Sequence, residues 1–497
     1  MDFLPDITVQ RARLSPDDVA LTEIGTGKKR TYAQLDERAA RAASVLAELD
    51  VKTGNRVAIL CRNRIAFFEL LFGCAKLGAI LVPLNWRMPA AELSPLIEDC
   101  DPALIIHGRE DDAAAESLAS AHSIASLNLD DPDDFETRMD QVDPIIGRAQ
   151  WPGSDPWYLI YTSGTTGRPK GVIQTYTMAM VNYINIGQAI GLRGTDSTLN
   201  FLPLFHTAGI NLHTLPVLIA GGTAHILPGF DADETLQMIA AGKIDVFLGV
   251  PAIYRELSLH PDFADTDLSR VRHWACGGAP LPDSLVECFA ARGPRVCNGF
   301  GMTETGPTAF LSNPEAATTK IGSVGKSQIL IESRIARSDG REAGINEVGE
   351  IQFFGPGLTP GYWNRRDETA ALYTDDGWLK SGDLGRRDSD GYVFVEGRIK
   401  DMYISGGENV YPAEIENVLA GHPDIIEAAI LGETDAKWGE TGCAYVQLKT
   451  GITGDPDVLA DFCRERLAAF KIPARFVFVE DLPRTAAGKV QKHLLQK

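Results

Sequence analysis

The apolar residues in the first part of the chain alternate between two spacings. From residue 32 to 49 they fall at positions 35, 39, 42, 46 and 49, in alternating steps of four and three, which predicts an amphipathic helix. Uninterrupted apolar runs predict buried strands at 57–60, 79–83 and 103–106, with helices at 66–76 and 89–98 between them. Strands that alternate with helices favour a mostly parallel sheet with helices on both faces.

A second rhythm of this kind begins near Trp157. It predicts strands at 158–161, 198–202, 223–227, 246–250 and 273–276. After Gly322, Gly, Pro and Asp interrupt short alternating runs such as 350–354 and 392–396, as is typical of antiparallel strands or a small barrel. From about Asp401 the pattern indicates a strand, a helix, two strands and a helix.

These patterns predict an α/β protein with more than one domain, since a chain of 497 residues with 44% apolar content is too long for one core. We expect a large N-terminal domain over residues 1–397, built of two doubly wound α/β subdomains and a small distorted β-barrel. A connection at 398–401 would join it to a small α+β C-terminal domain at 402–497.

Composition narrows the classes of function. The chain has 47 Lys and Arg against 67 Asp and Glu, a net charge of -20, which disfavours nucleic acid and anionic membranes as partners. Its eight cysteines lack metal-binding spacing, so reduced thiols are expected. The beginning lacks a signal-peptide pattern, no apolar run approaches the roughly 18 residues of a membrane span, and the ending Leu-Leu-Gln-Lys is not a peroxisomal signal. We therefore expect a cytoplasmic protein.

The strongest local motif, at 162–171, directly follows the apolar run at 158–161. It reads Thr-Ser-Gly-Thr-Thr-Gly-Arg-Pro-Lys-Gly. Its glycines let backbone N–H groups approach a ligand, its hydroxyls add hydrogen bonds and Lys170 adds positive charge, which together suit a phosphate. The spacing of Gly164, Gly167 and Lys170 does not match the loop of P-loop NTPases.

This motif resembles the phosphate loop of the adenylate-forming superfamily, which comprises acyl-CoA synthetases, luciferases and peptide-synthetase adenylation domains. Further signatures of that superfamily occur in order between about Tyr32 and Lys492. They lie at 203–206 (Pro-Leu-Phe-His), 277–280 (Gly-Gly-Ala-Pro), 298–304 (Asn-Gly-Phe-Gly-Met-Thr-Glu), 349–350, 377–383, 397–401, 405–416 and 483–489.

The resemblance implies a site for ATP and Mg²⁺. Glu304 and Thr166 would hold the metal, because hard oxygen ligands suit Mg²⁺. Small residues at 277–279 would admit the adenine ring, Phe300 would stack on it, and Asp383 would accept hydrogen bonds from both ribose hydroxyls. The predicted nucleotide-binding residues are Thr162, Ser163, Gly164, Thr165, Thr166, Gly167, Lys170, Gly277, Gly278, Ala279, Asn298, Gly299, Phe300, Thr303, Asp383, Arg398 and Lys489.

The resemblance also implies two half-reactions. Lys489 would hold the acid's carboxylate against the α-phosphate, with Thr166, Glu304 and His206 as the other predicted catalytic residues. The C-terminal domain would then rotate about a hinge at Lys400 and present a tunnel wall to coenzyme A. The predicted CoA-binding residues are Ser405, Gly406, Gly407, Glu408, Phe470, Lys471 and Arg475.

Position 206 bears on the branch of the superfamily. An amino-acid-activating domain normally has an Asp after the residue matching Phe205, to pair with an ammonium group, whereas this chain has His206. In having a histidine at this position, the chain resembles the acyl-CoA synthetase branch. Nothing in the sequence indicates the O₂ chemistry of luciferases, and intact Lys489, Glu304 and Thr166 disfavour a non-catalytic nucleotide-binding protein.

The acid itself is inferred from a predicted pocket of mostly small residues: His206, Ala208, Gly209, Asn211, Gly277, Gly301 and Met302. Such a pocket favours an aromatic or phenylpropenoate acid, with a medium-chain fatty acid as the alternative. The prediction is thus an AMP-forming acid:CoA ligase that uses ATP, Mg²⁺ and coenzyme A. Its expected partners are small molecules, with no nucleic acid and no membrane span, and a homodimer stays open.

Overall fold

The predicted helix after Tyr32 is present as α2 (Tyr32–Glu48). Thr31 begins it with a capping box, in which its hydroxyl accepts from the backbone N–H of Gln34 and the Gln34 side chain accepts from the N–H of Thr31. The structure is a computed structural model of residues 1–497, and it describes all of them except 132–133, 163–168, 280, 436–437, 485–489 and 496–497.

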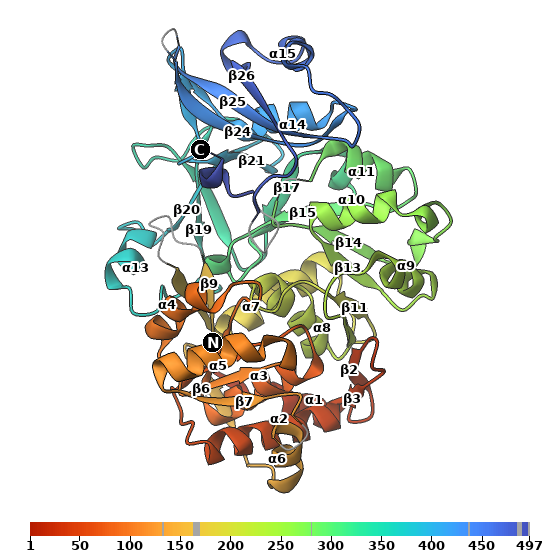
Figure 1. The fold of residues 1–497 in the computed structure, drawn as a ribbon, viewed down its shortest axis with the longest axis vertical. Helices are drawn as coiled ribbons and strands as arrows, with labels where there is room; N and C mark the ends of the chain where they lie inside the picture. The colour runs from red at the N-terminus through yellow and green to blue at the C-terminus, as the bar shows by residue number, and fades with distance from the viewer. Residues whose placement is uncertain (132–133, 163–168, 280, 436–437, 485–489, 496–497) are drawn as a thin grey trace.

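The first predicted rhythm forms a six-stranded sheet at the bottom of Figure 1. Its strand order is β10 (Lys170–Thr175), β9 (Pro156–Thr162), β5 (Ile80–Pro83), β4 (Arg56–Leu60), β6 (Leu104–His107) and β7 (Ala125–Asn128). All are parallel to their neighbours except β10, which is antiparallel to β9. Val57 and Ile59 face a core shared with α2 and α3 (Ile65–Leu77), while Ala58 and Leu60 face α4 (Ala90–Cys100) and α5 (Asp112–His122). The doubly wound prediction is confirmed here.

The first strand of the second rhythm, at 158–161, is β9 of the first sheet, so its expected grouping with the later strands was wrong. The later strands form the parallel part of a larger sheet: β14 (His273–Cys276), β13 (Val246–Gly249), β11 (Ser197–Asn200) and β12 (Thr223–Ile226), extended by β2 (Val19–Glu23) and by β15 (Val296–Phe300), neither of which was predicted. The hairpin strand β3 (Lys29–Thr31) ends it. One core contains apolar residues of α9 (Ala232–Ala240), α10 (Pro251–Leu259) and α11 (Asp283–Ala290), and α8 (Thr214–Ala220) packs into the core of the first sheet.

The strands expected to form a small barrel continue this same sheet instead. They are β16 (Phe310–Leu311), β17 (Ser323–Ser327), β21 (Val393–Arg398), β20 (Leu379–Arg387), β19 (Gly349–Phe354) and β18 (Glu332–Ala336), all antiparallel to their neighbours. Irregular register in β17, β19 and β20 bends the sheet, but the path of described strands does not close. In this respect the barrel prediction was wrong.

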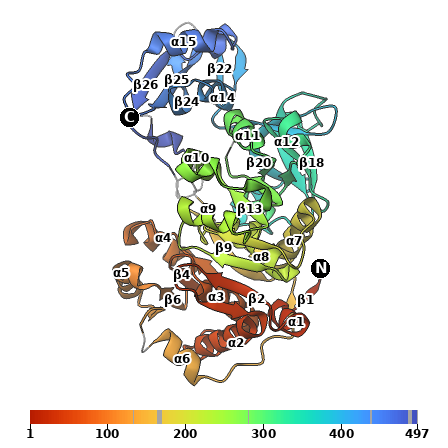
Figure 2. The ribbon, with the colours of Figure 1, turned by 90° about the vertical axis from the view of Figure 1, so that its right-hand side faces the viewer.

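A separate sheet follows Arg398 and lies at the top of Figures 1 and 2. It contains β22 (Tyr403–Ser405), β23 (Glu408–Val410), β24 (Ile425–Asp435), β25 (Gly439–Leu448) and β26 (Arg475–Val479), with α14 (Pro412–Ala420) and α15 (Pro456–Arg464) packed in its core. The predicted α+β composition is confirmed, although β26 was not predicted.

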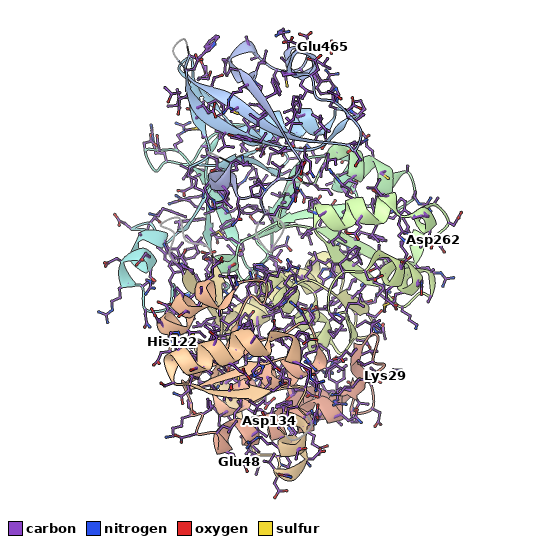
Figure 3. All side chains as sticks on the ribbon, viewed as in Figure 1. Lys29, Glu48, His122, Asp134, Asp262 and Glu465 are labelled. Atoms are coloured by element: carbon purple, nitrogen blue, oxygen red, sulfur yellow. The ribbon has the colours of Figure 1, made fainter. Side chains whose placement is uncertain are left out.

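The remaining elements connect these layers. They are β1 (Phe3–Pro5), β8 (Gln150–Pro152), α1 (Ile7–Leu14), α6 (Phe135–Gln141), α7 (Tyr176–Ile190), α12 (Ala316–Thr319), α13 (Arg366–Leu372), the π-helical segment η2 (Ala208–Leu212), and the 3₁₀ turns η1 (Arg109–Asp111), η3 (Pro261–Ala264), η4 (Leu268–Arg270), η5 (Thr303–Thr305), η6 (Ala469–Lys471) and η7 (Lys492–Leu494). Charged side chains such as Lys29, Glu48 and Glu465 lie at the periphery of Figure 3. In the part of the chain that the structure describes, no helix is both long and apolar enough to cross a membrane.

Candidate active site

Predicted nucleotide-binding residues gather at the carboxyl ends of β14 and β15. These strands are parallel, and Cys276 pairs with Asn298, so the segments 277–279 and 299–304 leave the same edge of the sheet. Gly277 and Gly299 lie close, because a Cβ on Gly277 would come 3.5 Å from the carbonyl oxygen of Gly299. Ligands of α/β sheets bind at such edges.

The motif at 162–171 begins and ends on adjacent strands. Thr162 ends β9, Lys170 begins β10, and the two residues pair across the hairpin. The predicted phosphate-binding residues Ser163, Gly164, Thr165, Thr166 and Gly167 lie outside the described residues, and so does the predicted catalytic Lys489. The structure therefore describes the two ends of the motif.

The Glu304 carboxylate is buried beside this hairpin, with 7% of the residue exposed. The hydroxyl of Tyr362 donates a 2.8 Å hydrogen bond to its Oε1 atom. The Nζ atom of Lys170 lies 5.0 Å from the centroid of the same tyrosine ring, a cation–π geometry. Burial and the nearby Glu304 raise the pKa of Tyr362, so its hydroxyl keeps the proton that it donates.

Hydrogen bonds to backbone carbonyl groups hold the segments around Glu304 together. The side-chain amide of Gln174 in β10 donates to the carbonyl oxygen of Thr303 at 2.8 Å, and the N–H of Thr359 donates to that of Glu304 at 2.9 Å. Val172 also forms a β-bridge with Tyr362. Sequence analysis missed Gln174 and Tyr362. Tyr362 lies 58 positions from Glu304, so the sequence gives no sign that the two residues meet. The one signal for a functional tyrosine was its position between Gly361 and Trp363.

The predicted ribose-binding pair is assembled on neighbouring strands. Asp383 in β20 pairs in register with Arg398 in β21, and the Arg398 Nε atom lies 2.7 Å from Asp383 Oδ1. Asp383 is buried, whereas 41% of the Arg398 side chain is exposed. The bridge orients the carboxylate and leaves much of the guanidinium facing solvent.

Phe300, which was predicted to stack on adenine, also packs against other aromatic rings. Its ring is stacked on Phe353 at a centroid distance of 6.3 Å and lies 6.1 Å from Phe310, so it takes part in the core of the antiparallel strands. The residue is partly exposed. Stacking on adenine stays a prediction, and it concerns the side of the ring away from that core.

The predicted acyl segment contains the π-helical turn η2, an irregularity that often occurs at functional sites. Within it, the Asn211 amide donates to the carbonyl oxygen of Gly306 at 2.9 Å, so the segment is joined to the one that contains Glu304. His206 and Ala208 are partly exposed beside it, as is Met302 near Glu304.

Two glycines of the predicted acyl pocket have another explanation. A Cβ on Gly209 would lie 2.4 Å from the carbonyl oxygen of Pro203, and one on Gly301 would lie 1.7 Å from that of Pro307. Close backbone approach therefore requires both glycines. Their small size is not evidence for a wide pocket.

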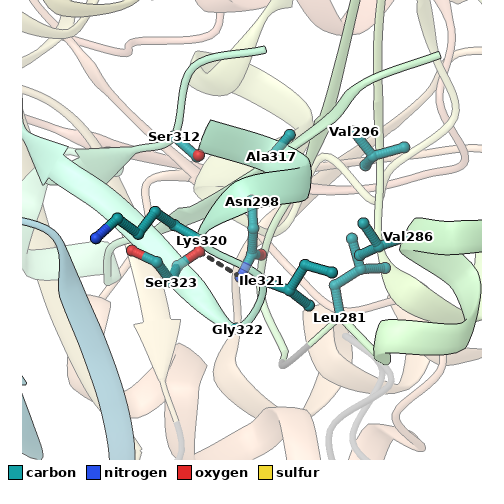
Figure 4. A pocket seen from close by; sticks show the side chains of 10 residues that line it. All are labelled: Leu281, Val286, Val296, Asn298, Ser312, Ala317, Lys320, Ile321, Gly322 and Ser323. Carbon is teal, nitrogen blue, oxygen red and sulfur yellow. Dashed lines mark hydrogen bonds between the residues drawn. The ribbon is translucent and has the colours of Figure 1, made fainter. Parts of the chain in front are cut away.

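A small cavity lies behind Asn298, between α11, α12 and β17 (Figure 4). Ser323 and Lys320 contribute its polar lining, and the Asn298 side-chain amide donates to the carbonyl oxygen of Ser323 at 3.4 Å. Its volume is 10 Å³. This is room for about one water molecule, so it is neither an acid nor a nucleotide site.

The predicted CoA-binding residues lie in the C-terminal sheet region. Gly406 and Gly407 are exposed between β22 and β23, and Glu408, the first residue of β23, is exposed as well. Two cations of this set are paired within their own region: Lys471 contacts Glu414 at 2.7 Å, and Arg475 contacts Glu433. The other two predicted residues are Ser405, which is buried, and Phe470, which packs at the core of this sheet. The predicted hinge residue Lys400 is exposed in the turn that follows β21.

Known protein families match most of the chain. The family model of the AMP-binding enzymes matches residues 9–363, and that of the AMP-binding enzyme C-terminal domain matches residues 414–489. The chain belongs to the AMP-binding enzyme family.

Its similarity to individual members extends over nearly the whole chain. It is 38% identical to a feruloyl-CoA synthase from Amycolatopsis sp, over 97% of this chain and 96% of that protein. It is 35% identical to a long-chain-fatty-acid–CoA ligase from Mycobacterium tuberculosis, over 98% and 97%.

Solved structures of o-succinylbenzoate–CoA synthetase from Bacillus subtilis share the fold. The complex with its acyl-adenylate intermediate gives a TM-score of 0.91 at 32% identity, covering 100% of this chain and 99% of that one. The complex with ATP and magnesium ion gives 0.90 at 31% identity, covering 100% of both.

Proposed function

We propose that this protein is an AMP-forming carboxylic acid:CoA ligase that uses ATP and Mg²⁺. The observation that carries the proposal is that Tyr362 contacts both Glu304 and Lys170, the residue at which the 162–171 motif enters β10. It occurs in a chain that resembles acid–CoA ligases over nearly its full length. The site thus combines a cation for phosphate with a buried carboxylate for a metal.

A magnesium ion fits this place. Among the described residues, Glu304 Oε2 accepts no hydrogen bond, because the one to the carboxylate goes to Oε1. A hard carboxylate oxygen is a ligand that Mg²⁺ prefers. Glu304 and Thr166 would hold the ion, which when bound neutralises charge on the phosphates.

In the first half-reaction, the carboxylate oxygen of the acid attacks the α-phosphorus of ATP, and the bond to pyrophosphate breaks. The acid is already ionised, so no general base is needed. Lys489 would hold the two anions together and offset the developing charge, while Asp383 and Arg398 would orient the ribose. His206 would border the carboxylate.

In the second half-reaction, the sulfur of CoA attacks the acyl carbon, the bond to AMP breaks and the thiol proton is released. We propose that residues 402–497 rotate about Lys400 between the two steps, so that Ser405 to Glu408 replace Lys489 at the acyl group. Among the described residues, no atom lies within 4 Å of where a Cβ on Gly407 would be, which leaves room for a thin pantetheine chain, whereas a Cβ on Gly406 would lie 2.7 Å from the Trp438 ring.

An aromatic or arylpropenoate acid is the favoured substrate class. Sequence identity is 38% to a feruloyl-CoA synthase, and Ala208 is a small, partly exposed residue of the predicted acyl segment. The alternative of a fatty acid, which the sequence analysis gave as medium-chain, has support in the 35% identity to a long-chain-fatty-acid ligase. We expect the enzyme to act in the cytoplasm, and a homodimer stays open.

Isotope exchange between ATP and pyrophosphate tests the proposal. Exchange should require both Mg²⁺ and a carboxylic acid, with AMP as the nucleotide product, whereas release of ADP and phosphate would refute the mechanism. A panel of cinnamic, benzoic and short- to medium-chain fatty acids, scored by AMP release, then identifies the acid. A best substrate with an α-amino group would contradict the assignment to CoA ligases.

Glu304→Gln tests the metal role, since it removes one charge and almost no volume. We expect ATP use to fall by at least tenfold at limiting Mg²⁺, as for a lost charged contact. The melting temperature should stay that of the wild type. Full activity with unchanged Mg²⁺ dependence would exclude this role for Glu304.

A further inference from the structure

Tyr362 contacts both the anion and the cation of the proposed site. Its hydroxyl donates to Glu304 Oε1 at 2.8 Å, and the ring lies 5.0 Å from Lys170 Nζ. The tyrosine is itself fixed: its N–H donates to the Thr369 hydroxyl at 2.9 Å, and it bridges to Val172 in β10. A side chain held in this way can fix the groups that it contacts.

The hydrogen bond selects which carboxylate oxygen is available to a ligand. With Oε1 engaged by the phenol, rotation of the carboxylate is restrained and Oε2 is the atom presented. Burial favours this division, because a buried carboxylate without a donor is costly. Among the residues that the structure describes, neither Glu304 nor Lys170 forms an ion pair, although both lie against the same ring. The phenol thus keeps the two opposite charges apart.

We propose that Tyr362 is a positioning residue for adenylation: it orients Glu304 toward the metal and holds Lys170 for the phosphates. This inference rests on the proposed function, because it assumes that Glu304 binds Mg²⁺ and Lys170 binds phosphate. The hydroxyl and the ring have separate tasks. Loss of the hydroxyl weakens the use of metal, and loss of the ring also weakens the use of ATP.

The test measures calorimetric binding of ATP at increasing free Mg²⁺, which needs no turnover, together with ATP–pyrophosphate exchange against free Mg²⁺ and against ATP. Tyr362→Phe should raise the Mg²⁺ concentration at half-saturation by about tenfold, the worth of a hydrogen bond to a charged group, with KM for the acid unchanged. Tyr362→Leu should show this effect and also raise KM for ATP by a few-fold, since the cation–π contact is lost as well. Thioester formation from supplied acyl-AMP should stay at the wild-type rate in both variants.

Tyr373→Phe is the matched control. Tyr373 is another partly buried tyrosine nearby, but its hydroxyl donates to the carbonyl oxygen of Thr359 and not to a carboxylate. It should leave the Mg²⁺ half-saturation unchanged. Equal shifts in the two Phe variants would mean that lost packing is the cause, and would overturn the inference.

A double-mutant cycle separates the possible failures. If Tyr362 acts through Glu304, Tyr362→Phe should change nothing further in the Glu304→Gln background. Wild-type Mg²⁺ dependence in Tyr362→Phe, or two effects that multiply in full, would refute the role of Tyr362 while the proposed function stands. Wild-type Mg²⁺ dependence in Glu304→Gln would refute the metal role and this inference with it.

Discussion

The two halves of the proposed site differ in how they are held. On the large region, Glu304 and Asp383 are 7% and 4% exposed, and side-chain contacts of 2.8 and 2.7 Å fix their carboxylates. On the C-terminal region, Gly406 to Glu408 are exposed, and 53% of the Arg475 side chain faces solvent. Buried, hydrogen-bonded groups are preorganised, whereas exposed ones contribute little until a partner covers them.

This difference suits the proposed division of labour between the two half-reactions. Nucleotide binding and adenylation need groups whose positions are already set. A region that must present different residues in successive steps gains from a weaker connection. In this structure a hydrogen bond of 2.5 Å joins Arg255 Nη1 of α10 to the carbonyl oxygen of Ile426 in β24, across the two regions.

The largest expected effect comes from removing Lys489, the residue that the C-terminal region is proposed to contribute to adenylation. Lys489→Ala should lower acyl-AMP formation on the order of 100-fold or more, as for a preorganised electrostatic contact. Conversion of supplied acyl-AMP and CoA to thioester should continue. Single-turnover assays of each step measure this, and equal loss in both steps would contradict the division.

Lys400→Pro should have the opposite effect. Proline fixes φ near about -65°, so the turn after β21 could not absorb a rotation, and thioester formation should fall more than tenfold. The first burst of acyl-AMP should survive. Among the described residues the Lys400 N–H donates no hydrogen bond, so the substitution removes none from the fold. A variant that performs both steps at wild-type rates would exclude a hinge here.

Acid should weaken the large region through buried histidines. Burial lowers the pKa of His213 to about 3 and that of His273 to about 4. The unfolded chain, with histidine pKa near 6.5, binds these protons first, so stability is lost as pH falls from about 6.5 to about 4 for His273 and to about 3 for His213. Each histidine should cost about 1 kcal/mol at pH 5.5 relative to pH 7. Tm should depend less steeply on pH across this range in His213→Asn than in the wild type. An unchanged slope of Tm against pH would exclude this histidine as a cause.

The smallest effect should come from the contact between the regions. Arg255→Ala removes the hydrogen bond to Ile426, a net loss of about 1 kcal/mol. The loss affects only the arrangement of the two regions in which this bond forms. The arrangement should then be less populated, and acyl-AMP formation should slow by about two- to fivefold if it is the adenylating one. If the thioester step slows instead, this arrangement serves the second half-reaction.

Local elements could be predicted because their signals are local. The steps of four and three predicted α2, and the run at 273–276 coincides with β14. The motifs likewise indicated a phosphate site and a metal carboxylate before any contact was known. A buried strand must be apolar and a phosphate loop must contain glycine, wherever the chain goes next.

Which segments meet was decided only by the tertiary structure. An apolar run encodes burial but no partner, so the sequence by itself did not indicate that β2 joins the second sheet beside β12, or that the expected barrel stays open. The same holds for Tyr362, whose bond to Glu304 exists only because β10 and the segment at 359–363 pack together. The sequence determined what chemistry the chain carries, and long-range packing determined which atoms face each other, because pairing depends on register and shape across the whole core.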